Sequence, residues 1–313
     1  MSESARQNLL DQNTRARLAA AFAARLHFDE PMARHTSWHV GGPADLYFEP
    51  RDRSDLAAFL AAVPATVPLH WIGLGSNLLV RDGGIRGAVI ALHGALSTLE
   101  RRGDGEVWCE AGVPCARIAR QCARWGLREA HFFAGIPGTL GGALAMNAGA
   151  FGGETWRHVR RVEVIDRRGH LRTREACEYR TSYRHVEPPV AGEAYLAATL
   201  HFAQATAEET VQEDIRELLV RRRESQPIGE WSCGSVFTNP PGEHAARLID
   251  RAGLKGLRIG GASVSEKHAN FILNDGAASA ADLERLIATV QETVERQFGI
   301  RLVPEVRVIG EAA

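Results

Sequence analysis

The segment Gly73-Leu-Gly-Ser-Asn-Leu-Leu79 does most to decide the fold, because it follows an apolar stretch at 70–72 that is typical of a strand. Its two glycines leave backbone N–H groups uncovered by side chains, and successive amides in such a turn form a concave site for anions. Ser76 and Asn77 add side-chain donors. The pattern indicates a turn that wraps a pyrophosphate, and an ordinary glycine turn is the alternative.

The same segment excludes two common motifs. The dinucleotide fingerprint G-x-G-x-x-G needs a third glycine that opens a helix, and here G-x-G is followed by Ser-Asn-Leu. The G-x-S-x-G nucleophile elbow is also absent from the segment, which disfavours a serine hydrolase.

A second glycine-rich segment, AGIPGTLGGALAMNAGAFGG, occupies residues 134–153. Nearly every side chain in it is small, which predicts that a large planar or charged ligand lies close against the backbone. Tight packing of a helix on a sheet would produce the same composition. Two such segments in one chain favour a large dinucleotide.

Composition sets the wider limits. A chain of 313 residues is long enough for two or three domains, and its hydrophobic (45%) and charged (24%) fractions are those of a globular protein. The net charge of −1 gives no basic surface for nucleic acid. The five cysteines contain no C-x-x-C pair, so we expect reduced thiols and no metal site. The first ten residues lack the pattern of a signal peptide and no apolar run could span a membrane, so we expect a cytoplasmic protein.

Periodicity and capping residues predict a mixture of helices and strands, the α+β class. Among the helices, we expect one at 14–26, one capped by Ser54, and one with Pro114 at its first position. Strands are expected at 235–237 and 302–309, among others. A new domain is expected to begin near residues 226–227.

Six motifs occur in order: GLGSNLLVRDGGIRG, AGIPGTLGGALAMNAGAFG, YRTSYR, SCGSVFTNP, GLKGLRIGGASVSEKHANFILN and PEVRVIG. Together they resemble the UDP-N-acetylenolpyruvoylglucosamine reductase family over residues 35–310, and specifically its shorter, second type. The resemblance implies an FAD-binding fold of the vanillyl-alcohol oxidase and p-cresol methylhydroxylase type. Its FAD-binding subdomains would comprise residues 1–100 and 101–222, followed by an α+β substrate-binding domain at 223–301. The final strand, within 302–313, would return near the flavin.

The implied activity is the NADPH-dependent reduction of UDP-N-acetylglucosamine enolpyruvate to UDP-N-acetylmuramate, through noncovalent FAD, in peptidoglycan precursor synthesis. The expected partner is that UDP-sugar enolpyruvyl ether, bound by a monomer. Two alternatives remain: an FAD-dependent sugar or hydroxy-acid oxidase of the same fold, and a catalytically silent nucleotide-binding protein of the cell-wall machinery.

The resemblance also implies roles for single residues. Arg180 matches the arginine that holds the substrate carboxylate, Ser235 the proton donor, and Glu305 the third catalytic residue. On a strand, Glu305 would share a face with Val303 and Arg307, and a surface ion pair with Arg307 is the alternative explanation. The expected FAD-binding residues are Gly73, Leu74, Gly75, Ser76, Asn77, Leu78, Gly135, Ile136, Pro137, Gly138, Thr139, Gly142, Asn147 and Gly149. The expected substrate-binding residues are Tyr179, Arg223, Asn239 and Arg307. The sequence departs from the family pattern at His39, Tyr183 and Thr238.

Overall fold

The computed structural model describes residues 10–204 and 208–313. Residues 1–9, which carry most of the argument against a signal peptide, lie outside the described residues. In the part that is described, no helix is both long enough and apolar enough to cross a membrane.

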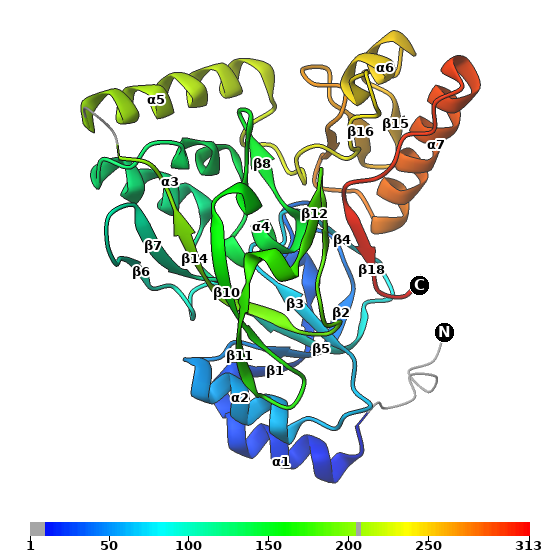
Figure 1. Ribbon diagram of the computed structural model, residues 1–313. Coiled ribbons are helices and arrows are strands. Elements are labelled where there is room, and N and C mark those ends of the chain that lie inside the picture. Colours follow the sequence, from blue (N-terminus) through cyan, green and yellow to red (C-terminus); the bar gives the residue numbers. More distant parts are fainter. Residues whose placement is uncertain (1–9, 205–207) are drawn as a thin grey trace.

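The N-terminal unit is a four-stranded sheet packed against two helices, α1 and α2, at the bottom of Figure 1. The strand order is β1-β2-β5-β3; β1 pairs antiparallel with β2, and β5 lies parallel between β2 and β3. Apolar side chains of both helices pack on one face of the sheet, where Phe22, Phe48 and Phe59 contact one another. The elements are α1 (Gln12–Phe22), β1 (Leu26–Pro31), β2 (Pro43–Phe48), α2 (Arg53–Ala62), β3 (Leu69–Ile72) and β5 (Ile85–Ala91).

The second unit is a five-stranded antiparallel sheet with the order β11-β10-β14-β7-β6. Its core includes Phe132 and Phe133, which stack on each other and pack against α3. The strands are β6 (Leu99–Arg101), β7 (Glu106–Glu110), β10 (Val159–Ile165), β11 (Leu171–Glu175) and β14 (Ala194–His201). The helices are α3 (Cys115–Arg124), α4 (Leu140–Met146) and α5 (Glu208–Ser225).

Two short antiparallel pairs complete the unit: β8 (Gly149–Ala150) with β9 (Gly153–Glu154), and β12 (Arg180–Ser182) with β13 (His185–Glu187). Short 3₁₀ helices lie at Ala23–Arg25, Met32–Arg34, Ala130–Gly135, Thr155–Arg157 and Ala176–Glu178.

The C-terminal unit packs α6 and α7 against a small antiparallel sheet of β15, β16 and β17. Hydrogen bonds and a shared buried cluster connect it to the N-terminal unit. The Trp38 indole donates to the Ile272 carbonyl (2.8 Å), Asn274 donates to the Trp38 carbonyl (2.7 Å), and Trp38 belongs to the same buried cluster as α7. The elements are α6 (Ala245–Arg251), β15 (Arg258–Ile259), β16 (Ala262–Val264), β17 (Ile272–Asn274) and α7 (Ala280–Phe298).

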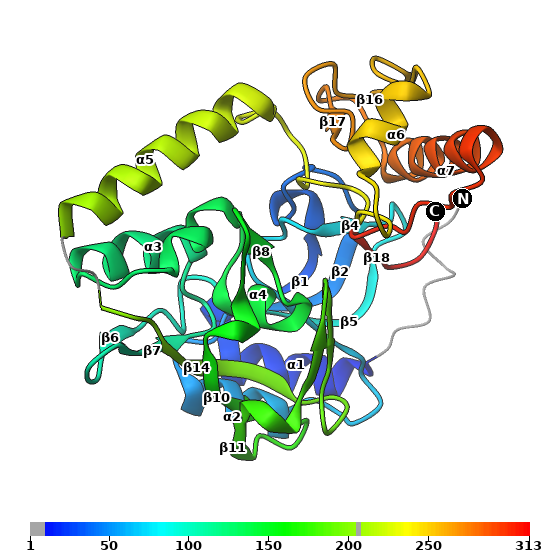
Figure 2. The ribbon, with the colours of Figure 1, turned by 45° about the horizontal axis from the view of Figure 1, so that its top comes forward.

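After α7 the chain returns to the N-terminal unit. The last strand, β18 (Arg307–Ile309), pairs in parallel with β4 (Leu78–Val80), which directly follows the first glycine segment. Both views place this red strand beside β4 (Figures 1 and 2). The C-terminal residues thereby reach the loop that we expected to bind a pyrophosphate.

Four local predictions were wrong. Asp52, not Ser54, caps α2, because its carboxylate accepts the Asp55 N–H. Pro114 occupies the N-cap of α3, one residue before the helix. Residues 235–237 and 302–306 are not strands: hydrogen bonds such as that from the Glu305 N–H to the Val236 carbonyl and an isolated bridge between Phe237 and Pro304 join them, but proline has no N–H to extend a ladder. The predicted helix at 14–26 ends at Phe22, because Leu26 already begins β1.

Candidate functional site

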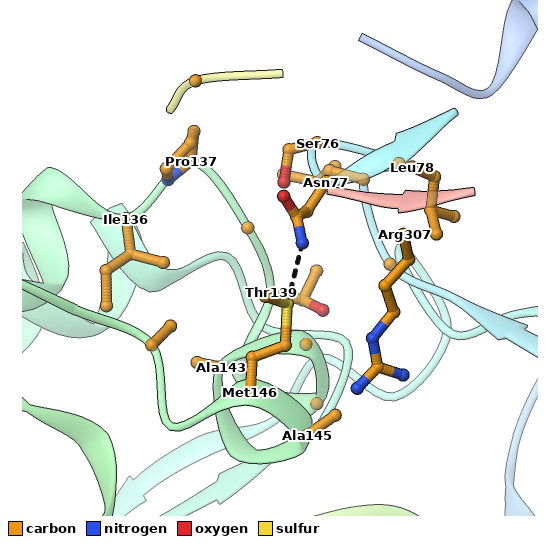
Figure 3. A pocket seen from close by; sticks show the side chains of 18 of the residues that line it. Ser76, Asn77, Leu78, Ile136, Pro137, Thr139, Ala143, Ala145, Met146 and Arg307 are labelled. Atoms are coloured by element: carbon orange, nitrogen blue, oxygen red, sulfur yellow. Dashed lines mark hydrogen bonds between the residues drawn. The ribbon is translucent and has the colours of Figure 1, made fainter. Parts of the chain in front are cut away.

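A cavity of about 720 Å³ lies where the three units meet, within the usual size range for ligand sites. Its wall takes residues from β3, from both glycine segments, from β14 and α5, and from the segments around Ser235 and Glu305. Figure 3 shows the first loop and β18 on one side and the second glycine segment, with α4, facing them. The site is thus built from parts of the chain that are far apart in sequence.

Every residue predicted from the first glycine segment, 73–78, lines this cavity. Two of its glycines are required by packing within the protein. Gly75 has φ +62°, and a Cβ there would overlap the His35 carbonyl oxygen; a Cβ on Gly73 would overlap the Thr139 hydroxyl. Both glycines therefore allow the chain to pack closely against itself, whatever occupies the cavity.

Gly142 in the second segment is different. Apart from its chain neighbours and the backbone of α4 itself, a Cβ added to Gly142 would meet no atom of the described residues within 4 Å, although Gly142 lines the cavity. Gly138 is nearly as open, with the Ser76 hydroxyl at 3.5 Å as its nearest neighbour. Gly135 and Gly149, by contrast, are confined by Ala150 and by the Gly153 carbonyl. The missing side chains at Gly138 and Gly142 leave a cradle that serves no packing within the protein.

One predicted FAD-binding residue is outside the cavity wall. Asn147 ends α4 in a left-handed conformation (φ +45°) and is buried. Its amide donates to Glu154 (2.8 Å) and to the Ser182 carbonyl (3.0 Å), and its oxygen accepts the Trp156 N–H. These contacts join α4 to the β12–β13 hairpin, so the observed contacts of Asn147 are structural, and its role toward FAD stays a prediction.

Ser235 and Glu305 both line the cavity, and backbone hydrogen bonds hold their segments together. The Glu305 N–H donates to the Val236 carbonyl (2.7 Å), and the Asn77 amide donates to the Glu305 carbonyl (3.0 Å). Burial in the cavity wall raises the pKa of the Glu305 carboxyl, and the charge of Arg184 offsets part of this rise. The arrangement places a hydroxyl and a carboxyl of raised pKa beside the first glycine loop.

The third predicted catalytic residue lies elsewhere. Arg180 is outside the cavity wall, its side chain is 86% exposed, and it lies 3.8 Å from Glu187 on the neighbouring strand. The arginine that the structure brings to the cavity is Arg184, whose Nε lies 3.0 Å from Glu305 Oε1. Sequence reasoning did not single out Arg184, because the YRTSYR pattern does not reveal where the chain turns. The role of Arg180 stays a prediction from the family motif.

Of the predicted substrate-binding residues, Arg307 lines the cavity, and Figure 3 shows its side chain extending from β18 toward Ala145 on α4. Tyr179 packs against Trp156 instead, with ring centroids 4.5 Å apart. Asn239 is exposed, and its side-chain oxygen accepts the Ala245 N–H at the start of α6. Arg223 is exposed as well. Glu305 and Arg307 share the cavity, as their spacing predicts, but Val303 is 61% exposed and outside it.

Several cavity residues lay outside the sequence predictions. Trp71, Met146, Tyr195 and Arg222 belong to ordinary strands and helices, and Glu193 and Phe271 directly precede β14 and β17.

Comparisons with known proteins agree on one family. Residues 44–174 match the model of an FAD binding domain, and residues 226–309 match that of the UDP-N-acetylenolpyruvoylglucosamine reductase C-terminal domain. The UDP-N-acetylenolpyruvoylglucosamine reductase of Alkalilimnicola ehrlichii is 58% identical, over 90% of this chain and 94% of that protein. That of Nitrosococcus oceani is 56% identical, over 94% and 98%. The crystal structure of the reductase from Thermus caldophilus superposes with a TM-score of 0.77 at 34% identity, covering 89% of this chain and 97% of the other.

Proposed function

Since the chain belongs to the UDP-N-acetylenolpyruvoylglucosamine reductase family, we propose that it reduces UDP-N-acetylglucosamine enolpyruvate to UDP-N-acetylmuramate, with FAD as cofactor and NADPH as hydride donor. This reaction is a step of peptidoglycan precursor synthesis. The observation that carries the proposal is the cavity, which brings Ser235 and Glu305 to a wall built from two glycine segments.

The cavity fits FAD. Two glycine-rich backbone segments line it, and the open positions at Gly138 and Gly142 leave room for a large group against α4. The residues that would hold FAD are those of the first loop and of the segment 135–142, with Ser76 and Thr139 as side-chain hydrogen-bonding groups. Bound FAD supplies the hydride chemistry, so the protein has to supply orientation, stabilisation of charge and one proton.

Residues of this chain would supply the orientation, the stabilisation of charge and the proton. Hydride addition to the enol ether leaves negative charge that spreads into the adjacent carboxylate, and Arg307, in the cavity wall, can attract that charge. The Ser235 hydroxyl would then give its proton to the carbon next to the carboxylate. A serine is a weak acid, so this transfer depends on its neighbours, and Glu305 is the cavity carboxyl whose segment is bonded to that of Ser235. Arg180 is proposed to hold the substrate carboxylate on the strength of its motif alone.

We further infer that the protein works as a cytoplasmic monomer. Its nucleotide substrates are soluble, and the described residues of one chain supply the cavity wall, with Ser235 and Glu305 in it. Light scattering of the purified protein at micromolar concentration tests the monomer, and a species of twice the mass would refute it.

The experiment that tests the function is anaerobic. NADPH should bleach the bound flavin, and the enolpyruvyl ether of the UDP-sugar should restore its colour in one turnover. Bleaching of the flavin by a simple sugar or hydroxy acid, with its colour then restored by oxygen but not by the enolpyruvyl ether, would indicate the oxidase. Purified protein that takes up no flavin would indicate the silent binding protein.

A further inference from the structure

Arg184 occupies an unusual position for an arginine. It is the second residue of the two-residue loop between β12 and β13, which is closed by the pair Ser182 and His185. Its φ is +55°, a conformation that glycine and asparagine adopt at least cost. A large side chain kept in such a conformation is a recognised mark of functional sites.

The hairpin also directs this side chain inward. Arg184 is 19% exposed and lines the cavity, whereas Arg180, at the open end of the same hairpin, is 86% exposed. The two Nη atoms of Arg184 donate to the carbonyls of Asn147 (3.5 Å) and Gly149 (2.8 Å), in the second glycine segment. The ring of Tyr183 lies 5.3 Å from its guanidinium carbon. Arg184 is thus anchored to the backbone that ends α4.

The remaining nitrogen faces Glu305. Arg184 Nε lies 3.0 Å from Oε1, yet the two lack the alignment of a hydrogen bond, so this buried N–H has no hydrogen-bond partner among the described residues. Such contacts often tighten only when substrate binds. Glu305 is only 16% exposed. The buried Cys233 lies near enough for the Glu305 charge to add to the effect of burial in raising the pKa of its thiol. Other charged or titratable residues that line the same cavity are Arg307, Arg222, Glu193 and Tyr195.

We propose that Arg184 is a positioning residue for Glu305: its fixed positive charge holds the Glu305 carboxyl against the cavity wall, on the segment bonded to that of Ser235. This inference rests on the proposed function, because it concerns the step in which the substrate receives its proton. Arg184 would act through Glu305 and would not itself touch the reacting atoms.

The test compares Arg184→Gln and Arg184→Lys with a matched control, Arg172→Gln, which removes an arginine from the exposed strand β11. Flavin content and melting temperature check folding. In Arg184→Gln, flavin reduction by NADPH should stay within about twofold of wild type, while reoxidation by the enolpyruvyl ether at neutral pH should slow by roughly 10- to 100-fold, as for loss of one charged contact. Arg184→Lys should recover much of this loss, and Arg172→Gln should match wild type.

A pH profile separates positioning from a merely structural role. Arg184 favours the charged form of Glu305, so its removal should move the Glu305 inflection of the reoxidation rate upward by about 1–3 pH units. When Glu305→Gln is already present, adding Arg184→Gln should change the rate little. A profile that does not move, or a rise in KM alone, would overturn the inference and leave the proposed function standing. Wild-type flavin that the enolpyruvyl ether does not reoxidise would overturn both.

Discussion

Replacing Gly142 by valine should separate the two explanations for the glycine-rich segment 134–153. If these glycines serve only internal packing, the valine should damage the fold. If Gly142 serves a bound ligand, the fold should survive and flavin binding should fail. The structure favours the second outcome, because outside its own helix a Cβ at Gly142 would meet no atom within 4 Å in the part of the chain that the structure describes.

The expected magnitudes follow from this geometry. Gly142 lies inside α4, where valine is a slightly better helix former than glycine, so the flavin-free protein should change by less than about 0.5 kcal/mol. The three added carbon atoms occupy the cradle that we assign to FAD, and overpacking of this kind costs about 1–3 kcal/mol. The FAD dissociation constant should therefore rise by roughly 5- to 150-fold.

Two measurements decide the matter: thermal unfolding of flavin-free protein and a titration with FAD. The matched comparison is Gly75→Ala, which puts a side chain at φ +62° against the His35 carbonyl and should destabilise the flavin-free protein itself. If Gly142→Val lowers the melting temperature of flavin-free protein as much as Gly75→Ala does, the glycine is structural. If it binds FAD within about threefold of wild type, below the range worked out above, the cofactor does not lie against α4.

Four further outcomes are expected. Ser235→Ala should reduce its flavin normally with NADPH but reoxidise it about 10²–10⁴-fold more slowly with substrate, by stopped flow; a loss below about threefold would remove Ser235 as proton donor. Initial-rate lines for NADPH and the sugar nucleotide should be parallel, since one cavity would serve both in turn, and intersecting lines would argue for two sites. Asp82→Ala should cost about 0.5–2 kcal/mol in urea unfolding, because that carboxylate accepts the Ala280 and Ala281 N–H groups at the start of α7; unchanged stability would show that it does not matter there. Folding raises the pKa of Glu305, so its neutral form contributes stability that is present below the ordinary carboxyl pKa and is lost as pH rises through the raised pKa. The Glu305→Gln variant does not titrate there, so it should gain stability relative to wild type from pH 4 to 7. A constant difference in stability between the two proteins would contradict the raised pKa.

The sequence predicted the family, the α+β class and the FAD cofactor correctly, because these depend on ordered motifs and on local periodicity. The predicted strand at 302–309 failed for a non-local reason. A ladder needs a partner strand, and within this range only Arg307–Ile309 have one, β4. Pattern alone could not show where that partner ends.

The glycines set a different limit. A glycine needed to make room for a ligand and a glycine needed for close packing within the protein look identical in sequence, since at both positions a side chain would not fit. Only the neighbours of the missing Cβ distinguish them. His35 and Thr139 account for Gly75 and Gly73, whereas none of the described residues outside α4 accounts for Gly142.

The two arginines of the YRTSYR motif show most clearly what the motif leaves open. A motif conveys which residue types recur, but the direction of each side chain depends on where the chain turns. Here the turn falls between Ser182 and His185, so Arg184 enters the cavity at the tip while Arg180 stays on an exposed strand. Glu305, more than a hundred residues later, meets Arg184 only because the C-terminal strand returns to β4. The ion pair between Arg184 and Glu305 in the cavity therefore depends on a tertiary contact between two segments. Neither motif alone could have predicted that contact.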